Sequence, residues 1–257
     1  MAKTPQDPKP PRFSPTKLLT YQECPRQYYF QYLLKLPQRP AAAMSFGSSL
    51  HRALQQSYEA GGPKAHDAEV LAAGLQEQWV DTGFADPETA AQFLAAGQQM
   101  LRSYHAEAQQ EEGTAVLLEK RLTASYKDLA FFGIVDRVDR LPDSTLEVID
   151  YKSTRRVPQD ATGVDPDHLQ QLGLYTYLAE QHLGGAVSFA SIHYLRAGKR
   201  LRLEMTPTWL GDVLATSYGT ARAILDDREF LPFFGPHCQD CPYLRACKRL
   251  GKGPAPL

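Results

Sequence analysis

Two aspartates lie at the ends of neighbouring apolar runs in the middle of the chain. Asp136 follows the run 131–135, and Asp150 follows the run 146–149. The segment 141–144 between them has the proline and polar residues of a turn. We therefore expect two adjacent strands that bring the two acids close together.

Lys152 stands two residues after Asp150, and residues i and i+2 of a strand point to the same face. With Asp136, this places two carboxylates beside one ammonium group. Carboxylate oxygens suit a hard divalent cation, and a lysine beside the cation can orient a water or neutralise charge that develops on a phosphate. An ordinary group of solvated or salt-bridged side chains remains the alternative for such a short pattern.

The patterns around this hairpin predict an α/β fold with a mixed central β-sheet flanked by helices. An Ala-, Gln- and Glu-rich stretch at 66–112, broken near Asp86–Pro87, predicts a helical insertion. The other expected elements are a helix that starts at Ser14–Pro15, an aromatic helical run with Tyr28, Tyr29, Phe30 and Tyr32, a helix around 46–54, strands at 115–126, 187–195 and 200–205, and helices at 168–183 and 208–227. The aromatic run is interpreted as core, with base stacking as the alternative.

Composition bounds the class of protein. With 257 residues, 43% of them hydrophobic, and a net charge of −1, the chain has a sizeable core and no overall basic field. No apolar run approaches the roughly 20 residues of a membrane span, so we expect no membrane association. Residues 1–13, rich in Pro and Lys, are predicted to form a disordered arm rather than a signal peptide. A cytoplasmic location is the expectation, and no phosphate-binding loop of a motor protein occurs.

The four cysteines are Cys24, Cys238, Cys241 and Cys247. In a reducing compartment they are expected to be free thiols or metal ligands rather than disulfides. Zinc usually takes two C-x2-C pairs, whereas proline after Cys24 and after Cys241 favours an iron–sulfur cluster. Unrelated thiols remain the third alternative. If all four are ligands, they tie the two ends of the chain together.

Taken in order, these motifs resemble the RecB-like branch of the PD-(D/E)XK nucleases that carries an iron–sulfur staple. This branch includes the nuclease domains of AddB helicase–nucleases and the CRISPR-associated RecB-like exonucleases. The matching segments are 21–25 around Cys24, G-x-x-x-H at 47–51, G-x-x-D-R-x-D at 133–139, D-x-K at 150–152, Q-x-x-x-Y at 171–175, and the three C-terminal cysteines. Val135 stands where the superfamily name has proline, and the insertion 66–112 matches none of these motifs.

The resemblance implies a restriction-endonuclease-like core, a single nuclease domain over 14–257 and a cluster-binding tail at 230–257. It implies that Mg²⁺ or Mn²⁺ is held by His51, Asp136, Asp150 and the carbonyl of Tyr151, although a lone helical histidine is more often structural. It gives Lys152 a catalytic role, together with the acids, and makes Gln171 and Tyr175 supporting residues of the site. The ligands implied for a 4Fe-4S cluster are Cys24, Cys238, Cys241 and Cys247.

The implied function is a metal-dependent DNA exonuclease that acts on single strands or DNA ends, in repair, recombination or CRISPR-type processing. A helicase or another repair protein is the implied partner. The first alternative is a non-catalytic nucleic-acid-binding subunit of a helicase–nuclease complex that keeps the fold. A redox iron–sulfur protein is the second alternative, but no flavin or nucleotide motif accompanies the cysteines.

Overall fold

A mixed six-stranded sheet forms the centre of the protein in the computed structural model, which describes residues 10–249. The strand order is β1-β3-β4-β5-β6, and β2 also pairs with β3. The pairs β1/β3 and β4/β5 are parallel and the others are antiparallel. The strands are β1 Arg12–Phe13, β2 Thr114–Tyr126, β3 Leu129–Arg140, β4 Leu146–Lys152, β5 Val187–Tyr194 and β6 Lys199–Glu204. The predicted mixed α/β architecture is confirmed.

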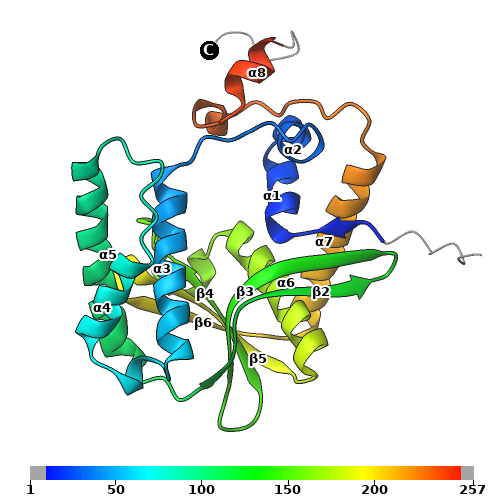
Figure 1. Cartoon of the computed structure of the whole chain (residues 1–257). Helices are drawn as coiled ribbons and strands as arrows, with labels where there is room; N and C mark the ends of the chain where they lie inside the picture. The colour runs from blue at the N-terminus through cyan, green and yellow to red at the C-terminus, as the bar shows by residue number, and fades with distance from the viewer. Residues whose placement is uncertain (1–9, 250–257) are drawn as a thin grey trace, which may run out of the picture.

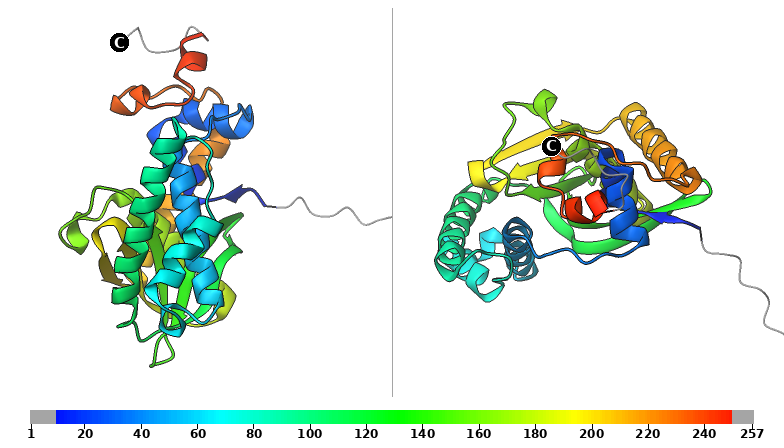
Figure 2. Two further views of the ribbon diagram at one scale, coloured as in Figure 1. Left: turned by 60° about the vertical axis from the view of Figure 1, so that its left-hand side comes forward. Right: turned by 90° about the horizontal axis from the view of Figure 1, so that it is seen from above.

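Helices cover both faces of the sheet (Figure 1). One core lies between the sheet and the helices α6 (Pro166–Leu183) and α7 (Pro207–Asp226). The other lies under α3 (Ala42–Glu59), α4 (Ala68–Glu77) and α5 (Pro87–Ala108). The helices α4 and α5 occupy the stretch expected to form a helical insertion. They form one side of the molecule beside α3 in all three views (Figures 1 and 2).

The N-terminal helices and the C-terminal segment of the described chain meet above one end of the sheet (Figure 1). The N-terminal part contributes α1 (Pro15–Glu23), α2 (Pro25–Tyr28) and a π-helical turn at Tyr29–Leu33. Ser14 caps α1 by accepting a hydrogen bond from the Lys17 amide. The C-terminal part contributes the 3-10 turn Pro236–Gln239 and α8 (Leu244–Arg249), and further 3-10 turns lie at Pro63–Ala65, Ala161–Gly163 and Leu195–Ala197. Across residues 10–249, no helix combines the length and the apolar character needed to span a membrane.

One predicted boundary is wrong. The disordered arm was expected to reach residue 13, but Phe13 is buried and Arg12–Phe13 pairs with β3 through Ala130 and Phe131. Residues 1–9 of that arm, and 250–257 of the predicted tail, lie outside the described residues. Asp136 does not end its strand, and β3 continues to Arg140, just before the predicted turn at 141–144. It continues because its next polar side chains are buried and paired.

The central one of these side chains is Arg137, whose guanidinium is fully buried. Its Nε and Nη2 donate to both carboxylate oxygens of Asp139 at 2.7 and 2.6 Å. Its Nη1 donates to the hydroxyls of Tyr104 and Tyr151, both at 2.8 Å, and to that of Tyr58. These contacts join β3, β4, α3 and α5 at one buried charge.

The network extends to the far edge of the sheet through carboxylates. Glu111 pairs with both Arg137 and Arg200. Glu147, itself 1% exposed, pairs with Arg200 and Arg202. Three arginines and three acids therefore balance one another, as a low-dielectric environment requires.

We predict that Arg137→Met lowers the free energy of unfolding by about 3–5 kcal/mol, because it leaves Asp139 buried without its cation and leaves Glu111 with Arg200 alone. Urea denaturation followed by circular dichroism measures the change. The matched control is Arg102→Met, which breaks an equally short but exposed pair with Glu69. The control should unfold like the parent protein. An equal effect of both variants would show that burial of the network does not matter.

Candidate active site

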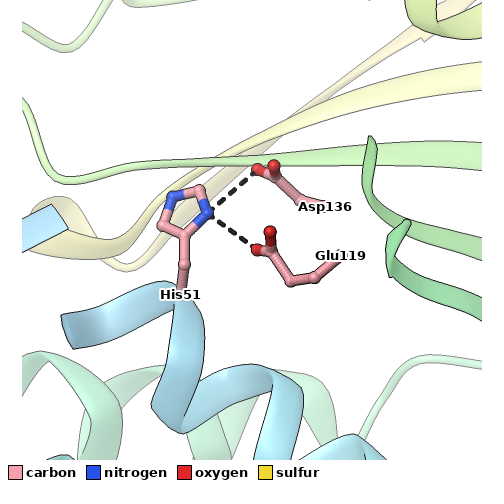
Figure 3. Close-up of side chains that lie close together, drawn as sticks. All are labelled: His51, Glu119 and Asp136. Atoms are coloured by element: carbon pink, nitrogen blue, oxygen red, sulfur yellow. Dashed lines mark hydrogen bonds and ion pairs between the residues drawn. The ribbon is translucent and has the colours of Figure 1, made fainter. Parts of the chain in front are cut away.

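Three potential metal ligands from three different elements meet on the α3 side of β2 and β3. They are His51 of α3, Glu119 of β2 and Asp136 of β3, and their ligand atoms lie within 4.8 Å of one another. His51 Nδ1 lies 3.0 Å from Glu119 Oε1 and 3.5 Å from Asp136 Oδ2. Figure 3 shows the imidazole turned toward both carboxylates. One nitrogen donor and two carboxylates form a suitable set of ligands for a divalent cation.

A local break in the strand alternation directs the two acids to this point. Leu117 and Leu122 of β2 lie in the same core although they are five residues apart, and in a regular strand they would face opposite ways. Glu119 lies between them with φ of +41°, a left-handed conformation that is unusual for this residue type. Opposite it on β3, Val135 and Val138 also share that core across an odd spacing. The alternation of side chains between the two faces is therefore shifted by one residue on both strands, at Glu119 and at Asp136.

His51 lies in a strongly negative environment. Burial alone would lower the pKa of the imidazole, but the carboxylates of Asp136 and Glu119 raise it well above its usual range. Its second nitrogen, Nε2, lies 3.1 Å from the carbonyl oxygen of Tyr151. Both ring nitrogens therefore face acceptors. The same acceptors would attract a divalent cation, which competes with the proton for the imidazole.

Asp150 lies on β4, beside Asp136 of the paired strand β3, as the sequence predicts. The side chain of Asp136 is fixed by the Tyr151 amide, which donates to its Oδ2 at 2.9 Å. Burial raises the pKa of Asp150, and Asp136 adds to the rise while Lys152 opposes it. Asp150 Oδ2 forms an ion pair with Lys152 Nζ, 2.8 Å away. A buried carboxylate beside a second acid of the paired strand fits a cation ligand.

Lys152 is held by a short chain of side chains from α6. Its ammonium donates to Gln171 Oε1 at 2.8 Å, and Gln171 Nε2 donates to the Tyr175 hydroxyl at 2.9 Å. Burial lowers the pKa of Lys152, but the carboxylates of Asp150 and Asp136 outweigh it, so the pKa is raised and the ammonium stays charged. Gly133 of β3 leaves room for this helix, because a Cβ there would lie 2.7 Å from the Tyr175 ring.

All of these side chains line one cleft of about 760 Å³. Two arginines line the same cleft, Arg155 after β4 and Arg196 after β5. Burial and the charge of Arg155 lower the pKa of Arg196, and neither arginine forms an ion pair with an acid in the described part of the chain. Phe93 of α5, which is partly exposed, adds apolar surface. The cleft therefore combines a candidate cation site, guanidinium groups without an acidic partner and an aromatic ring.

The four cysteines converge at a second place, where the chain ends meet. Cys24, Cys238, Cys241 and Cys247 line one small cavity together with Phe30 and Phe233. All four are free thiols, Cys24 and Cys238 are buried, and burial raises the pKa of Cys241. Thiols drawn from both chain ends into one apolar cavity fit a shared soft metal centre.

The structure brings the predicted site residues together in two groups. One cleft holds His51, Asp136, Asp150, Tyr151, Lys152, Gln171 and Tyr175, and one cavity holds the four cysteines. Sequence reasoning missed Glu119, which belongs to the cation site, and the pair Arg155 and Arg196. The adjacent leucines Leu117–Leu118 just before Glu119 interrupt the alternation of the strand and are the available signal for it.

Comparisons with known proteins identify the family of the chain. Among solved structures, a proposed exonuclease from Eubacterium rectale is 12% identical, with a TM-score of 0.50 over 82% of this chain and 79% of that chain. The crystal structure of SSO0001 is 13% identical, with a TM-score of 0.46 over 97% of this chain and 89% of that chain. No curated protein matches the chain. The family description "PD-(D/E)XK nuclease superfamily" matches residues 12–248, which include the cleft and all four cysteines, and the chain belongs to this superfamily.

Proposed function

We propose that the chain is a deoxyribonuclease dependent on Mg²⁺ or Mn²⁺, an exonuclease that hydrolyses phosphodiester bonds of single-stranded DNA or of DNA ends. The observation that carries this proposal is the meeting of His51, Glu119 and Asp136 in the cleft. Membership of the nuclease superfamily and the likeness to a protein described as a proposed exonuclease support it.

The cation would be held by His51, Glu119 and Asp136, with Asp150 and the Tyr151 carbonyl beside them. Asp150 supports this set of ligands, because its buried carboxylate lies beside Asp136 of the paired strand. When bound, such a cation lowers the pKa of a coordinated water and polarises the phosphate that it contacts. The protein supplies orientation and charge around it.

Lys152 supplies the positive charge nearest the two acids. Its ammonium is fixed between Asp150 and Gln171, so it can stabilise the negative charge that grows on the phosphate oxygens during attack. Tyr175 fixes the amide of Gln171 and thereby the lysine. Gln171 and Tyr175 are positioning residues in this assignment, since they act through Lys152.

The rest of the cleft suits a DNA strand. Arg155 and Arg196 offer guanidinium groups for phosphates. Phe93, which is partly exposed, offers apolar surface to unpaired bases. The proposed partners beyond DNA are a helicase or another repair protein, and the proposed pathway is repair, recombination or CRISPR-type processing in the cytoplasm.

We further propose that the four cysteines hold a 4Fe-4S cluster of mainly structural role. In the described part of the chain, no three of their sulfur atoms lie within 4.8 Å of one another. Tetrahedral zinc, with Zn–S bonds of about 2.3 Å, would hold its sulfurs at about 3.8 Å. The thiols are therefore not gathered as tightly as a zinc site requires, and the prolines after Cys24 and Cys241 favour a cluster, in which each thiolate binds a different iron.

Lys152→Ala is expected to lower DNA cleavage in Mn²⁺ at least about a hundredfold, because one preorganised charge at the reacting phosphate is lost. Binding of the same oligonucleotide, measured by fluorescence anisotropy in Ca²⁺, should stay within a factor of about two, since strand affinity comes from other contacts. Cleavage at nearly the parental rate would refute the assignment of Lys152.

Glu119→Asn should separate the contribution of Glu119 to metal affinity from the cost of its left-handed backbone conformation. Asparagine adopts the left-handed conformation more readily than glutamate, so the melting temperature without metal should hold or rise. The increase in melting temperature on adding Mn²⁺ should shrink, because metal affinity falls. The control is Glu204→Asn, which removes an exposed acid from strand β6. An undiminished response to Mn²⁺ in Glu119→Asn would remove Glu119 from the site.

Cys24→Ser is expected to abolish the broad visible absorbance of the cluster and to reduce the bound iron and sulfide. The melting temperature should fall, because the link between the chain ends is lost. Iron, sulfide and zinc are measured after anaerobic purification. Colourless parent protein with stoichiometric zinc, or a Cys24→Ser variant that melts like the parent, would contradict the assignment.

A further inference from the structure

A row of side chains leads out of the cleft along the outer half of β3. Ile134 lines the cleft and is 47% exposed, which is unusual for an apolar residue within a paired strand. Its partner on β2 is Arg121. Phe132, two residues from Ile134 along β3, lies on the same face of the strand. The face of β3 that carries Asp136 at the cleft therefore continues beyond it as a surface formed by Ile134, Arg121 and Phe132.

Two cations lie against the ring of Phe132. The guanidinium carbon of Arg121 is 4.3 Å from the ring centroid, and the ammonium of Lys17, on α1, is 5.7 Å away. Lys17 also lies 5.5 Å from the ring centroid of Tyr32. We call Lys17, Tyr32, Arg121 and Phe132 the basic–aromatic cluster. It joins α1 and the π-helical turn to the β2–β3 hairpin.

The two cations of this cluster are not neutralised by the protein. Within residues 10–249, neither Lys17 nor Arg121 forms an ion pair. The Lys17 ammonium donates one hydrogen bond, to the Arg12 carbonyl at 3.5 Å. Burial and the charge of Arg121 lower the pKa of Lys17. Two like charges held close together, with aromatic rings as their main partners, attract an anion that contacts both.

We propose that the basic–aromatic cluster is a second DNA-binding site, which holds the phosphates and bases of a single strand whose other part lies in the cleft. This inference rests on the proposed nuclease function. Four residues of a strand span about 13 Å, so a few nucleotides reach from Asp136 to Phe132. The exposed Ile134 and the planar groups of the cluster favour a single strand, because unpaired bases stack on such surfaces and paired bases cannot.

The test is the double variant Lys17→Gln/Arg121→Gln, which keeps most of each side chain and removes both charges. Its affinity for a single strand of about ten nucleotides, a length within typical site sizes, is measured by anisotropy in EDTA at several salt concentrations. The matched control is Lys127→Gln. Lys127 also stacks on an aromatic ring, that of Tyr218 at 4.3 Å, but it lies at the hairpin tip against α7.

We expect the double variant to bind roughly tenfold more weakly, with a salt slope less steep by about 1.4 because two phosphate contacts are lost. Hydrolysis of a small chromogenic phosphodiester, which cannot reach the cluster, should keep its kcat and KM, while KM for the oligonucleotide rises. Unchanged affinity and slope, or an equal loss in Lys127→Gln, would overturn the inference. Binding in EDTA needs no catalysis, so parent protein that binds through the cluster but cleaves nothing would refute only the nuclease function.

Discussion

A single guanidinium that no water reaches constrains the whole centre of the molecule. Arg137 can stay buried only while Asp139 and Glu111 neutralise it and three tyrosine hydroxyls accept its remaining donors. One of these hydroxyls belongs to Tyr151. Because side chains alternate along β4, the anchored Tyr151 leaves the flanking Asp150 and Lys152 on the cleft side. The buried charge thus fixes, from behind, the strand that carries two of the proposed catalytic groups.

The cleft side depends on a second constraint, the reset of alternation at Glu119 and Asp136. A left-handed residue other than glycine costs free energy, and such strain persists only where the surroundings determine it. Here the surroundings are the two buried pairs Leu117/Leu122 and Val135/Val138, all in one core. The hydrophobic core holds the strained backbone in place, and the result is two carboxylates directed at His51.

Much of the site could be predicted from the sequence, because its parts are local. The placement of the D-x-K triplet on one strand face follows from simple periodicity, and the resemblance to a nuclease family singled out the i, i+4 pair Gln171 and Tyr175. The structure brings both to one cleft. The fold class followed in the same way from strand and helix patterns. Glu119 could not be predicted in this way, because a strand pattern of period two assumes that side chains alternate without a break. The conformation of Glu119 breaks the alternation, and packing against β3 and the core imposes it.

The course of β3 beyond Asp136 depends on the folded chain in a similar way. Polar residues such as Arg137 and Asp139 often mark the end of a strand in a sequence. Here they lie within the strand, because the charge of each neutralises that of the other. Their burial also depends on Glu111, which lies far away in the sequence. Charge balance among residues that are distant in the sequence is a property of the folded chain, and it cannot be predicted from a short sequence segment.

The meeting of the chain ends rests on more than the cysteines. Arg26 Nε donates to the Phe230 carbonyl at 2.7 Å, and the rings of Tyr28 and Phe230 stack with an interplanar angle of 8°. Tyr21 donates to Asp227 at 2.8 Å, and Asp227 in turn accepts the amide of Phe230. These contacts hold the N-terminal helices to the segment after α7 through apolar packing and hydrogen bonds alone.

A group bound by the four thiols would therefore reinforce an existing junction. Its effect should be largest on α8 and the 3-10 turn at Pro236–Gln239, which are attached to the N-terminal helices mainly around the thiol cavity. From this junction the chain runs through residues 34–41 directly into α3, the helix that carries His51. The proposed cluster and the proposed cation site are thus chemically separate, with soft ligands in one and hard ligands in the other, but one short connection links them mechanically.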